Sequence, residues 1–259
     1  MSRASAIPPA RLAVALAVAA VLSGLCSNPA AAQDPSTEPP NLVDSPVLGP
    51  SRANGSTTAR IITPTFARKR LRSKRYGRVI GVQTSWSGQP QTLLVLDSAM
   101  RGDRQWLKLL LPVRPNGSTG WVMRDRVVLS RTRYWIDVDV SARLVRVFHR
   151  GKRVRRFGAV VGAPGTPTPV GLAAIYERNR QPNPAGFLGP WALPLTILSN
   201  VLENYGGGPG RVAIHGRAGA SLSDPLGSAR SHGCIRVENR HIEWLAAGPP
   251  AGTPVRIRR

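Results

Sequence analysis

Short apolar runs separated by turn residues dominate the chain from about residue 60 onward, and they restrict it to a β-rich fold. Val, Ile and Leu are frequent in runs at 79–82, 93–96, 106–111, 120–122, 136–140, 144–148, 157–161, 211–214 and 254–257. Runs of this length between turn signals are typical of strands. The 26 Gly and 24 Pro of the chain supply many of these turns. We therefore expect a mainly β fold with one or two short helices, one of them at 239–247 with Asn239 as its cap.

The N-terminal segment has the pattern of an export signal. Arg3 and Arg11 provide positive charge, residues 12–25 are apolar, and three alanines at 30–32 offer a small-residue cleavage site. The apolar run is short for a transmembrane helix. We interpret residues 1–32 as a cleaved signal peptide, so the protein is expected in the periplasm or cell wall. The alternative is an uncleaved anchor, which would be the chain's only membrane contact.

The chain has 2 cysteines, one within the expected signal peptide and one near the C-terminus. Cys26 lies within the expected signal peptide, and lipidation there is disfavoured because Leu25, rather than a small residue, precedes it. Cleavage after Ala32 would leave Cys234 as the single cysteine, so no internal disulfide is expected. A lone thiol in an oxidising compartment suggests a chemical role.

Two domains are expected after the signal. Residues 33–59 are rich in Pro, Ser, Gly, Asn and Asp without periodicity, which predicts a disordered linker. In residues 60–130 an Asn-Gly turn at 116–117 is followed by Gly-Trp-Val at 120–122. This ending resembles the bacterial SH3-like modules that often precede cell-wall enzymes, so we expect a small SH3-like β-barrel over 60–130. A second β-rich domain is expected over 132–259.

The chain is strongly basic. It contains 36 Lys and Arg against 13 Asp and Glu, which gives a formal net charge of +23. Such a field concentrates anionic partners. The export signal favours anionic cell-wall polymers, and no aromatic-rich RNA-binding signature accompanies the basic runs. We therefore expect wall polymers, and no nucleic acid, as partners. The alternative is a solvated basic surface without a specific anion site.

The residues suited to catalysis gather near the C-terminus. His215 ends an apolar run, and His232 and Cys234 follow after a loop. A cysteine is activated when an imidazole takes its proton, so Cys234 is the candidate nucleophile and His215 the candidate base. The second nitrogen of His215 needs an acceptor, either Asp224 or, as we favour, a main-chain carbonyl. Gly233 permits a tight turn that directs main-chain N–H groups toward a developing oxyanion.

This segment resembles the L,D-transpeptidase catalytic domain, also called the YkuD-type domain. The family pattern is a His-Gly pair, a loop of about fifteen residues, and Ser/Thr-His-Gly-Cys followed shortly by Arg or Asn. The chain has His-Gly at 215–216, a loop at 217–230 and Ser-His-Gly-Cys-Ile-Arg at 231–236. The Thr-Pro-Thr-Pro corner at 166–169 and Gly-Thr-Pro-Val at 252–255 are also similar. The resemblance implies an L,D-transpeptidase-type β-sandwich.

The resemblance also implies site roles and an activity. Cys234 would be the nucleophile, His215 the base, and the Gly216 carbonyl the group that orients the imidazole. The main chain at 232–234 would form the oxyanion hole, and the other members of the motif would shape the site: Ser231, His232, Gly233 and Arg236. The implied reaction cross-links diaminopimelate residues of peptidoglycan stem peptides through a cysteine thioester, without a cofactor or metal.

Other readings of these residues remain open. Water in place of the amine acceptor would make the enzyme an L,D-carboxypeptidase, and an inactive domain would make it a cell-wall-binding protein. Papain-like enzymes have the cysteine before the histidine, and sortases have much longer spacing. A zinc site from His215, His232, Cys234 and His241 matches no common ligand spacing.

Overall fold

The structure is a computed structural model that describes residues 47, 49–73, 75, 77–205 and 207–259. All of these belong to one compact unit. The expected signal peptide at 1–32, Cys26 and most of the expected linker lie outside the described residues. Among the residues that are described, no helix is both long and apolar enough to cross a membrane.

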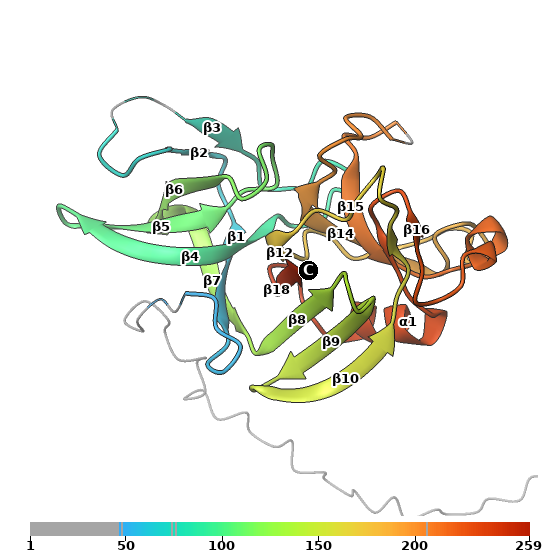
Figure 1. Cartoon of the computed structure of the whole chain (residues 1–259). Coiled ribbons are helices and arrows are strands. Elements are labelled where there is room, and N and C mark those ends of the chain that lie inside the picture. The colour runs from blue at the N-terminus through green and yellow to red at the C-terminus, as the bar shows by residue number, and fades with distance from the viewer. Residues whose placement is uncertain (1–46, 48, 74, 76, 206) are drawn as a thin grey trace, which may run out of the picture. The chain divides into compact units, whose positions relative to one another are not determined.

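The first half of the described chain is an antiparallel sheet. Its elements are β1 (Ser56–Ile61), β2 (Thr65–Ala67), β3 (Arg78–Ile80), β4 (Thr92–Arg101), β5 (Arg104–Leu110), β6 (Thr119–Met123), the 3₁₀ helix η1 (Arg124–Arg126) and β7 (Val127–Thr132). Five strands pair in the order β6-β5-β4-β1-β7, and β2 pairs with β3 (Figure 1). The SH3-like assignment of this half stays a prediction.

Strand β1 corrects the expected boundary of the linker. It begins at Ser56, whereas the linker was expected to extend to residue 59. Ser56 and Thr58 are buried, and β1 pairs with both β4 and β7. The strand begins with polar Ser and Thr residues, so no apolar run marks it in the sequence.

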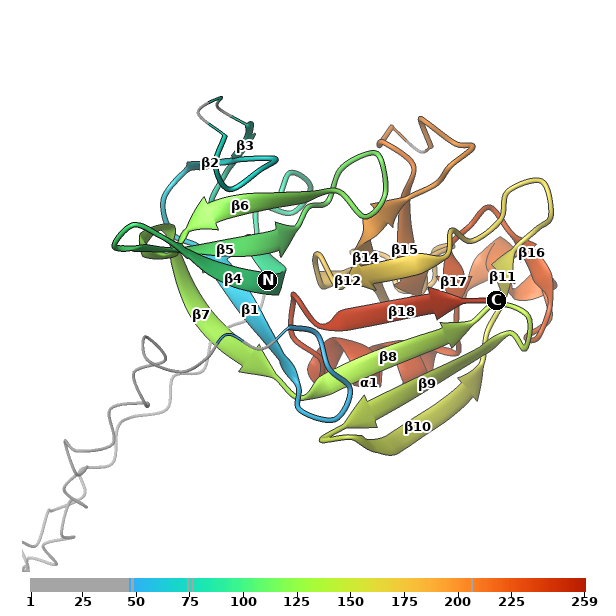
Figure 2. The ribbon, with the colours of Figure 1, turned by 60° about the vertical axis from the view of Figure 1, so that its left-hand side comes forward.

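The second half contains two main sheets and one α-helix (Figure 2). The first sheet has the order β10-β9-β8-β18-β12 and the second has the order β13-β14-β15-β17. The elements are β8 (Tyr134–Asp139), β9 (Leu144–His149), β10 (Lys152–Gly158), β11 (Val161–Gly162), β12 (Gly171–Ala174), β13 (Asn179–Arg180), β14 (Trp191–Leu198), β15 (Arg211–His215), η2 (Gly219–Ser223), β16 (Ala229–Ser231), β17 (Ile235–Arg236), α1 (Asn239–Ala247) and β18 (Pro254–Arg258). Strands β11 and β16 form a separate parallel pair.

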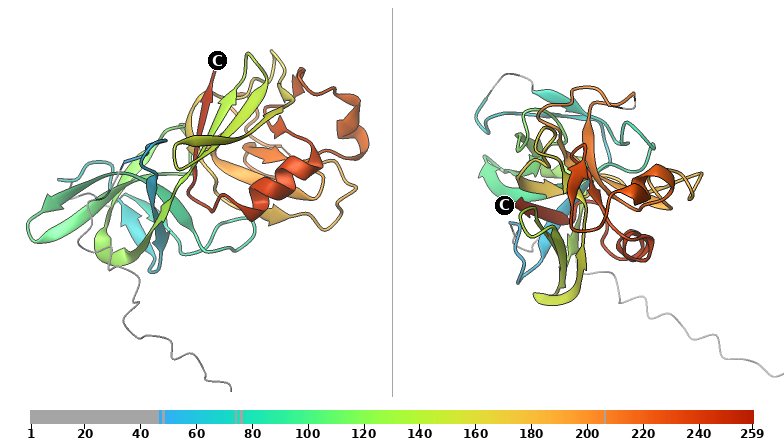
Figure 3. Two further views of the ribbon diagram at one scale, coloured as in Figure 1. Left: turned by 90° about the horizontal axis from the view of Figure 1, so that it is seen from below. Right: turned by 45° about the vertical axis from the view of Figure 1, so that its right-hand side comes forward.

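One apolar core joins the two sheets and the helix. Ile136 of β8, Leu193 of β14, Ile214 of β15 and Ile242 of α1 are fully buried members of it. Helix α1 packs against β14 and β15, and Figure 3 shows it from below. This core fixes β15 and β17, the two strands that carry the candidate catalytic residues. The prediction of a mainly β fold with short helices is confirmed.

The start of α1 differs from expectation. Asn239 is the first helical residue, and Glu238 takes the cap position without a side-chain cap bond. The Asn239 side chain instead accepts a hydrogen bond from the main-chain N–H of Arg217 at 2.8 Å. Asn239 therefore connects the helix to the loop that follows His215.

Candidate active site

Parallel pairing of β15 and β17 brings the candidate nucleophile and base to one cavity. Ile214 pairs with Ile235 and His215 with Arg236, so Cys234, just before β17, lies beside Ala213 of β15. His215 is only 1% exposed, whereas Cys234 is partly exposed. Both side chains line the same small cavity, of about 70 Å³. The loop between them is long in sequence, yet the strand register makes them neighbours.

The His215 ring is held by the main chain. Its Nδ1 lies 2.7 Å from the carbonyl oxygen of Gly216. A carbonyl can only accept, so Nδ1 carries the proton in the neutral ring and Nε2 keeps its lone pair. Asp224, the other acceptor considered, forms an ion pair with Arg236 instead.

Burial sets the resting protonation of the pair. It lowers the pKa of His215 to about 4, and the nearby Arg236 adds to this effect while the bond to Gly216 opposes it. Burial also raises the pKa of the Cys234 thiol, against a main-chain hydrogen bond from Ala213 and the charge of Arg236. A neutral thiol beside a neutral imidazole is therefore the favoured form at pH 7. Desolvation disfavours the charged form of each group.

Hydrogen bonds fix the loop that carries Cys234. The Ser231 hydroxyl accepts from the Gly233 N–H at 3.1 Å and donates to the Cys234 carbonyl at 2.6 Å. Thr168 Oγ1 donates to the Gly233 carbonyl at 2.9 Å, and it accepts from Gly162 N–H at 2.9 Å. Gly233 has φ of +114°, a conformation that side-chain-bearing residues rarely adopt. The Gly233 N–H is thus engaged within the loop rather than directed at a substrate.

Arg236 and His232 lie on different parts of the cavity. The Arg236 side chain is buried, paired with Asp224, and its guanidinium carbon lies 4.7 Å from the centre of the Phe187 ring. His232 is exposed, and its ring centre lies 5.5 Å from that of Tyr205. Arg236 therefore forms the inner wall, and His232 with Tyr205 forms the rim.

Gly216 lies where no side chain fits. A Cβ at this position would lie 2.5 Å from Asn239 Oδ1 and 3.1 Å from both Ile242 Cγ2 and Pro190 Cδ. This crowding fixes the peptide whose carbonyl faces His215. The close contact between Gly216 and Asn239 was not expected, because the sequence suggested only a capping role for Asn239.

Two further contributors carry no catalytic motif in the sequence. Phe187 reaches the cavity from a loop with no recognisable motif, and Thr168 was noted only as part of a similar corner. Within the described part of the chain, no group of three or more His, Cys, Asp and Glu side chains is placed to hold a metal ion. His241 stacks on Phe157 instead, with the ring centres 4.3 Å apart.

Comparison with known proteins places this site in a family. The model of the YkuD family, the L,D-transpeptidase catalytic domain, matches residues 133–257. A candidate L,D-transpeptidase YkuD of Bacillus licheniformis is 37% identical over 124 residues, which cover 48% of this chain and 65% of that protein. Its counterpart in Bacillus subtilis strain 168 is 32% identical over 126 residues, which cover 49% of this chain and 66% of that protein. The chain thus spans about two thirds of the length of these relatives.

Solved structures give a weaker likeness. An Enterococcus faecium L,D-transpeptidase mutant is 22% identical with a TM-score of 0.36, covering 49% of this chain and 50% of that one. An L,D-transpeptidase from Mycobacterium smegmatis is 15% identical with a TM-score of 0.39, covering 70% of this chain and 93% of that one. The family match, at residues 133–257, includes both His215 and Cys234. Residues 133–257 therefore belong to the YkuD family of L,D-transpeptidase catalytic domains.

Proposed function

We propose that this protein is an exported L,D-transpeptidase that acts on peptidoglycan stem peptides through a thioester on Cys234. The observation that carries the proposal is the shared cavity of Cys234 and His215, with Nδ1 of His215 bound to the Gly216 carbonyl. This arrangement leaves Nε2 as the proton acceptor within the same small cavity as the thiol. Cysteine and histidine in such an arrangement form the catalytic pair of acyl-transfer enzymes.

The first half-reaction forms the thioester. Cys234 Sγ attacks the carbonyl between diaminopimelate and the terminal D-alanine of a tetrapeptide stem, and its proton passes to His215 Nε2. The carbon–nitrogen bond then breaks, and His215 returns the proton to the amine of the leaving D-alanine. The proton transfer accompanies attack, because burial favours the neutral pair before the substrate binds.

The second half-reaction forms the cross-link. The side-chain amine of a neighbouring diaminopimelate attacks the thioester, His215 accepts its proton, and the Cys234 thiol is regenerated. We assign the oxyanion to the main-chain N–H of Cys234, because Gly233 N–H already donates to Ser231. Ser231, His232 and Arg236 shape the site without transferring protons.

The expected export signal supports the proposed location, and the net charge supports the wider partners. The net charge of +23 favours anionic cell-wall polymers around an exported protein. Such attraction would keep the enzyme near its polymeric substrate, and it weakens as salt screens the charges.

Product analysis tests the proposal. Purified protein is incubated with a disaccharide-tetrapeptide and the products are identified by mass spectrometry. We expect loss of D-alanine with a cross-linked dimer as the product, and neither from the Cys234→Ala variant. Release of D-alanine without a dimer would identify an L,D-carboxypeptidase, and unchanged tetrapeptide would overturn the enzymatic proposal in favour of a binding protein.

A further inference from the structure

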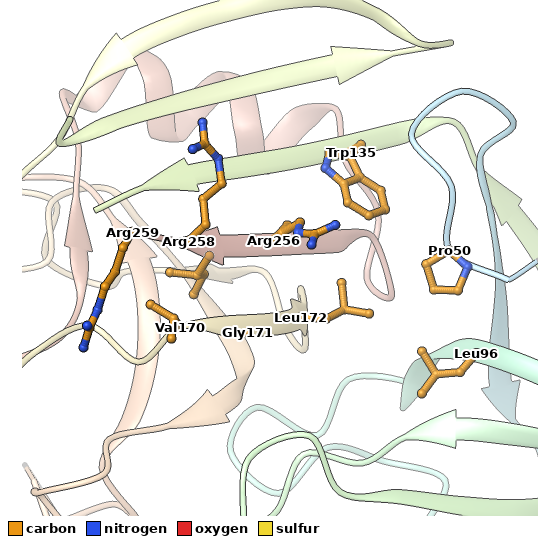
Figure 4. Close-up of a pocket in the computed structure, with 10 residues that line it drawn as sticks. Pro50, Leu96, Trp135, Val170, Gly171, Leu172, Arg256, Arg258 and Arg259 are labelled. Atoms are coloured by element: carbon orange, nitrogen blue, oxygen red, sulfur yellow. The ribbon is translucent and has the colours of Figure 1, made fainter. Parts of the chain in front are cut away.

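A second cleft lies between β4 of the first sheet and the outer face of β18 and β12. It has a volume of about 780 Å³ and shares no lining residue with the cavity of Cys234. Ligand sites commonly have volumes of about 300–1,000 Å³. Leu172 and Arg256 face Pro50 and Leu96 at one end, and Val170 lies at the other (Figure 4). The lining of the cleft thus combines apolar side chains with three arginines.

The carboxylates near this cleft are already paired. Asp137 accepts a hydrogen bond from the Trp135 indole at 2.6 Å and lies 3.8 Å from Arg52. Asp139 lies 2.9 Å from Arg258. The main-chain N–H of Ala142, the Arg146 side chain and the charge of Arg258 hold the pKa of Asp139 below its usual value, so it stays ionised and paired. No Asp or Glu is among the residues that line the cleft.

Two arginines in the cleft have no such partner. Arg256 and Arg259 are exposed, and among the described residues no carboxylate lies within ion-pair distance of either. Arg256 pairs in the sheet with Leu172, so an unpaired cation stands directly beside an aliphatic side chain. The unpaired arginines and the adjacent aliphatic side chains together favour a ligand that has both a carboxylate and small apolar groups.

We propose that this cleft binds an acidic peptide with small apolar side chains, namely a second stem peptide of the wall that is held away from the reacting one. The identity of the peptide rests on the proposed function. Its carboxylates would contact Arg256 and Arg259, and its methyl groups would cover Leu96, Val170 and Leu172. Binding at two places on one polymer raises the effective concentration of the wall at Cys234.

One short segment, residues 166–172, contacts both the cleft and the loop that carries Cys234. Val170 and Leu172 line the cleft, and Thr168, two residues before Val170, donates to the Gly233 carbonyl at 2.9 Å. Thr166 donates to the Ser231 carbonyl at 3.1 Å. A peptide in the cleft therefore lies on the same short segment that holds the loop of Cys234.

Binding to blocked protein tests this inference apart from catalysis. The full chain is alkylated with iodoacetamide, which closes the Cys234 cavity, and titrated calorimetrically with the tetrapeptide L-Ala-γ-D-Glu-meso-diaminopimelyl-D-Ala. We expect one peptide to bind, and Arg256→Glu to weaken the Kd at least tenfold. Arg153→Glu is the matched control, because Arg153 is an exposed arginine of β10 outside the cleft, and it should change the Kd less than twofold.

The outcomes separate the inference from the proposed function. Absence of binding to the alkylated chain, or equal weakening by both variants, would overturn the cleft site even if D-alanine is released. Binding that depends on Arg256, in a protein that releases no D-alanine, would support the cleft and overturn the catalytic proposal. With an active enzyme, Arg256→Glu should raise KM for insoluble wall several-fold, and the control Arg153→Glu should leave this KM unchanged.

Discussion

At the scale of single residues, burial decides the chemistry of His215. The ring is 1% exposed and its pKa is lowered to about 4, whereas an unfolded histidine titrates near pH 6.5. Between these two values the unfolded chain binds a proton that the folded chain does not. The contribution of the neutral His215 ring to the free energy of unfolding is therefore fully present above pH 6.5. It is lost as the pH falls toward 4.

This difference predicts an acid-sensitive fold. The free energy of unfolding should fall by about 3 kcal/mol between pH 6.5 and pH 4 on account of His215, since each pKa unit corresponds to about 1.4 kcal/mol. Urea denaturation at a series of pH values measures it. The His215→Gln variant lacks this titration and should show a shallower slope, so identical slopes would contradict the assigned burial effect.

Gly216 gives a second prediction at this scale. Gly216→Ala should destabilise the protein by about 1–3 kcal/mol and abolish D-alanine release, because the added methyl group meets Asn239, Ile242 and Pro190. Gly165→Ala is the matched control, because a Cβ there meets nothing within 4 Å. Thermal melting and D-alanine release are measured for both. Equal melting temperatures and equal D-alanine release in the two variants would show that crowding at Gly216 is unimportant.

At the scale of elements, much of the architecture was predictable. Alternating or continuous apolar residues predicted β8, β9, β15, α1 and β18, because each buries one face in a shared core. Strand β14 was missed because Pro194 lies within its run, and β1 because it begins with polar residues. Local patterns do not reveal a strand whose stability comes from pairing on both sides.

The candidate site was predictable to a similar degree. The motif at 231–236 and His215 identified the residues that meet in the cavity. The hydrogen bonds of Thr168 and Asn239 were not predictable, because they join segments distant in sequence through the tertiary fold. Asp224 looked available to His215 in sequence, but its loop turns it toward Arg236.

The support of the nucleophile loop by Thr168 is testable. Thr168→Val removes the donor to the Gly233 carbonyl and the acceptor of Gly162 N–H, both buried. The variant should lose about 1–3 kcal/mol of stability and most of its kcat, since unsatisfied buried polar groups are costly. Thr168→Ser keeps the hydroxyl and should retain most of both. Equal loss in the two variants would show that the hydroxyl group alone does not account for the support of the loop.

At the scale of the whole molecule, the first sheet and the catalytic half share contacts. Tyr176 belongs to the apolar core of the first sheet, and its hydroxyl donates to Gln91 Oε1 at 3.1 Å. Gln89 donates to the Arg178 carbonyl at 2.9 Å. Because these groups are buried or partly buried, separating the halves would leave them without partners.

The two halves should therefore unfold together. We expect one urea transition, with tryptophan fluorescence and far-UV circular dichroism coinciding. Tyr176→Phe should lower the free energy of unfolding by about 1 kcal/mol through loss of the buried hydrogen bond. Tyr205→Phe, at an exposed tyrosine, should leave it unchanged. Two separate transitions would contradict a cooperative unit.

The central claim is that Cys234 forms an acyl-enzyme with a stem peptide. It is tested most directly by mixing the protein with tetrapeptide, quenching in acid, and measuring the intact mass followed by peptide mapping. We predict a protein heavier by one tripeptide acyl group, with the added mass on the peptide that contains Cys234, and no adduct in Cys234→Ala. Release of D-alanine with the adduct on another residue, or with the same adduct in Cys234→Ala, would contradict the account.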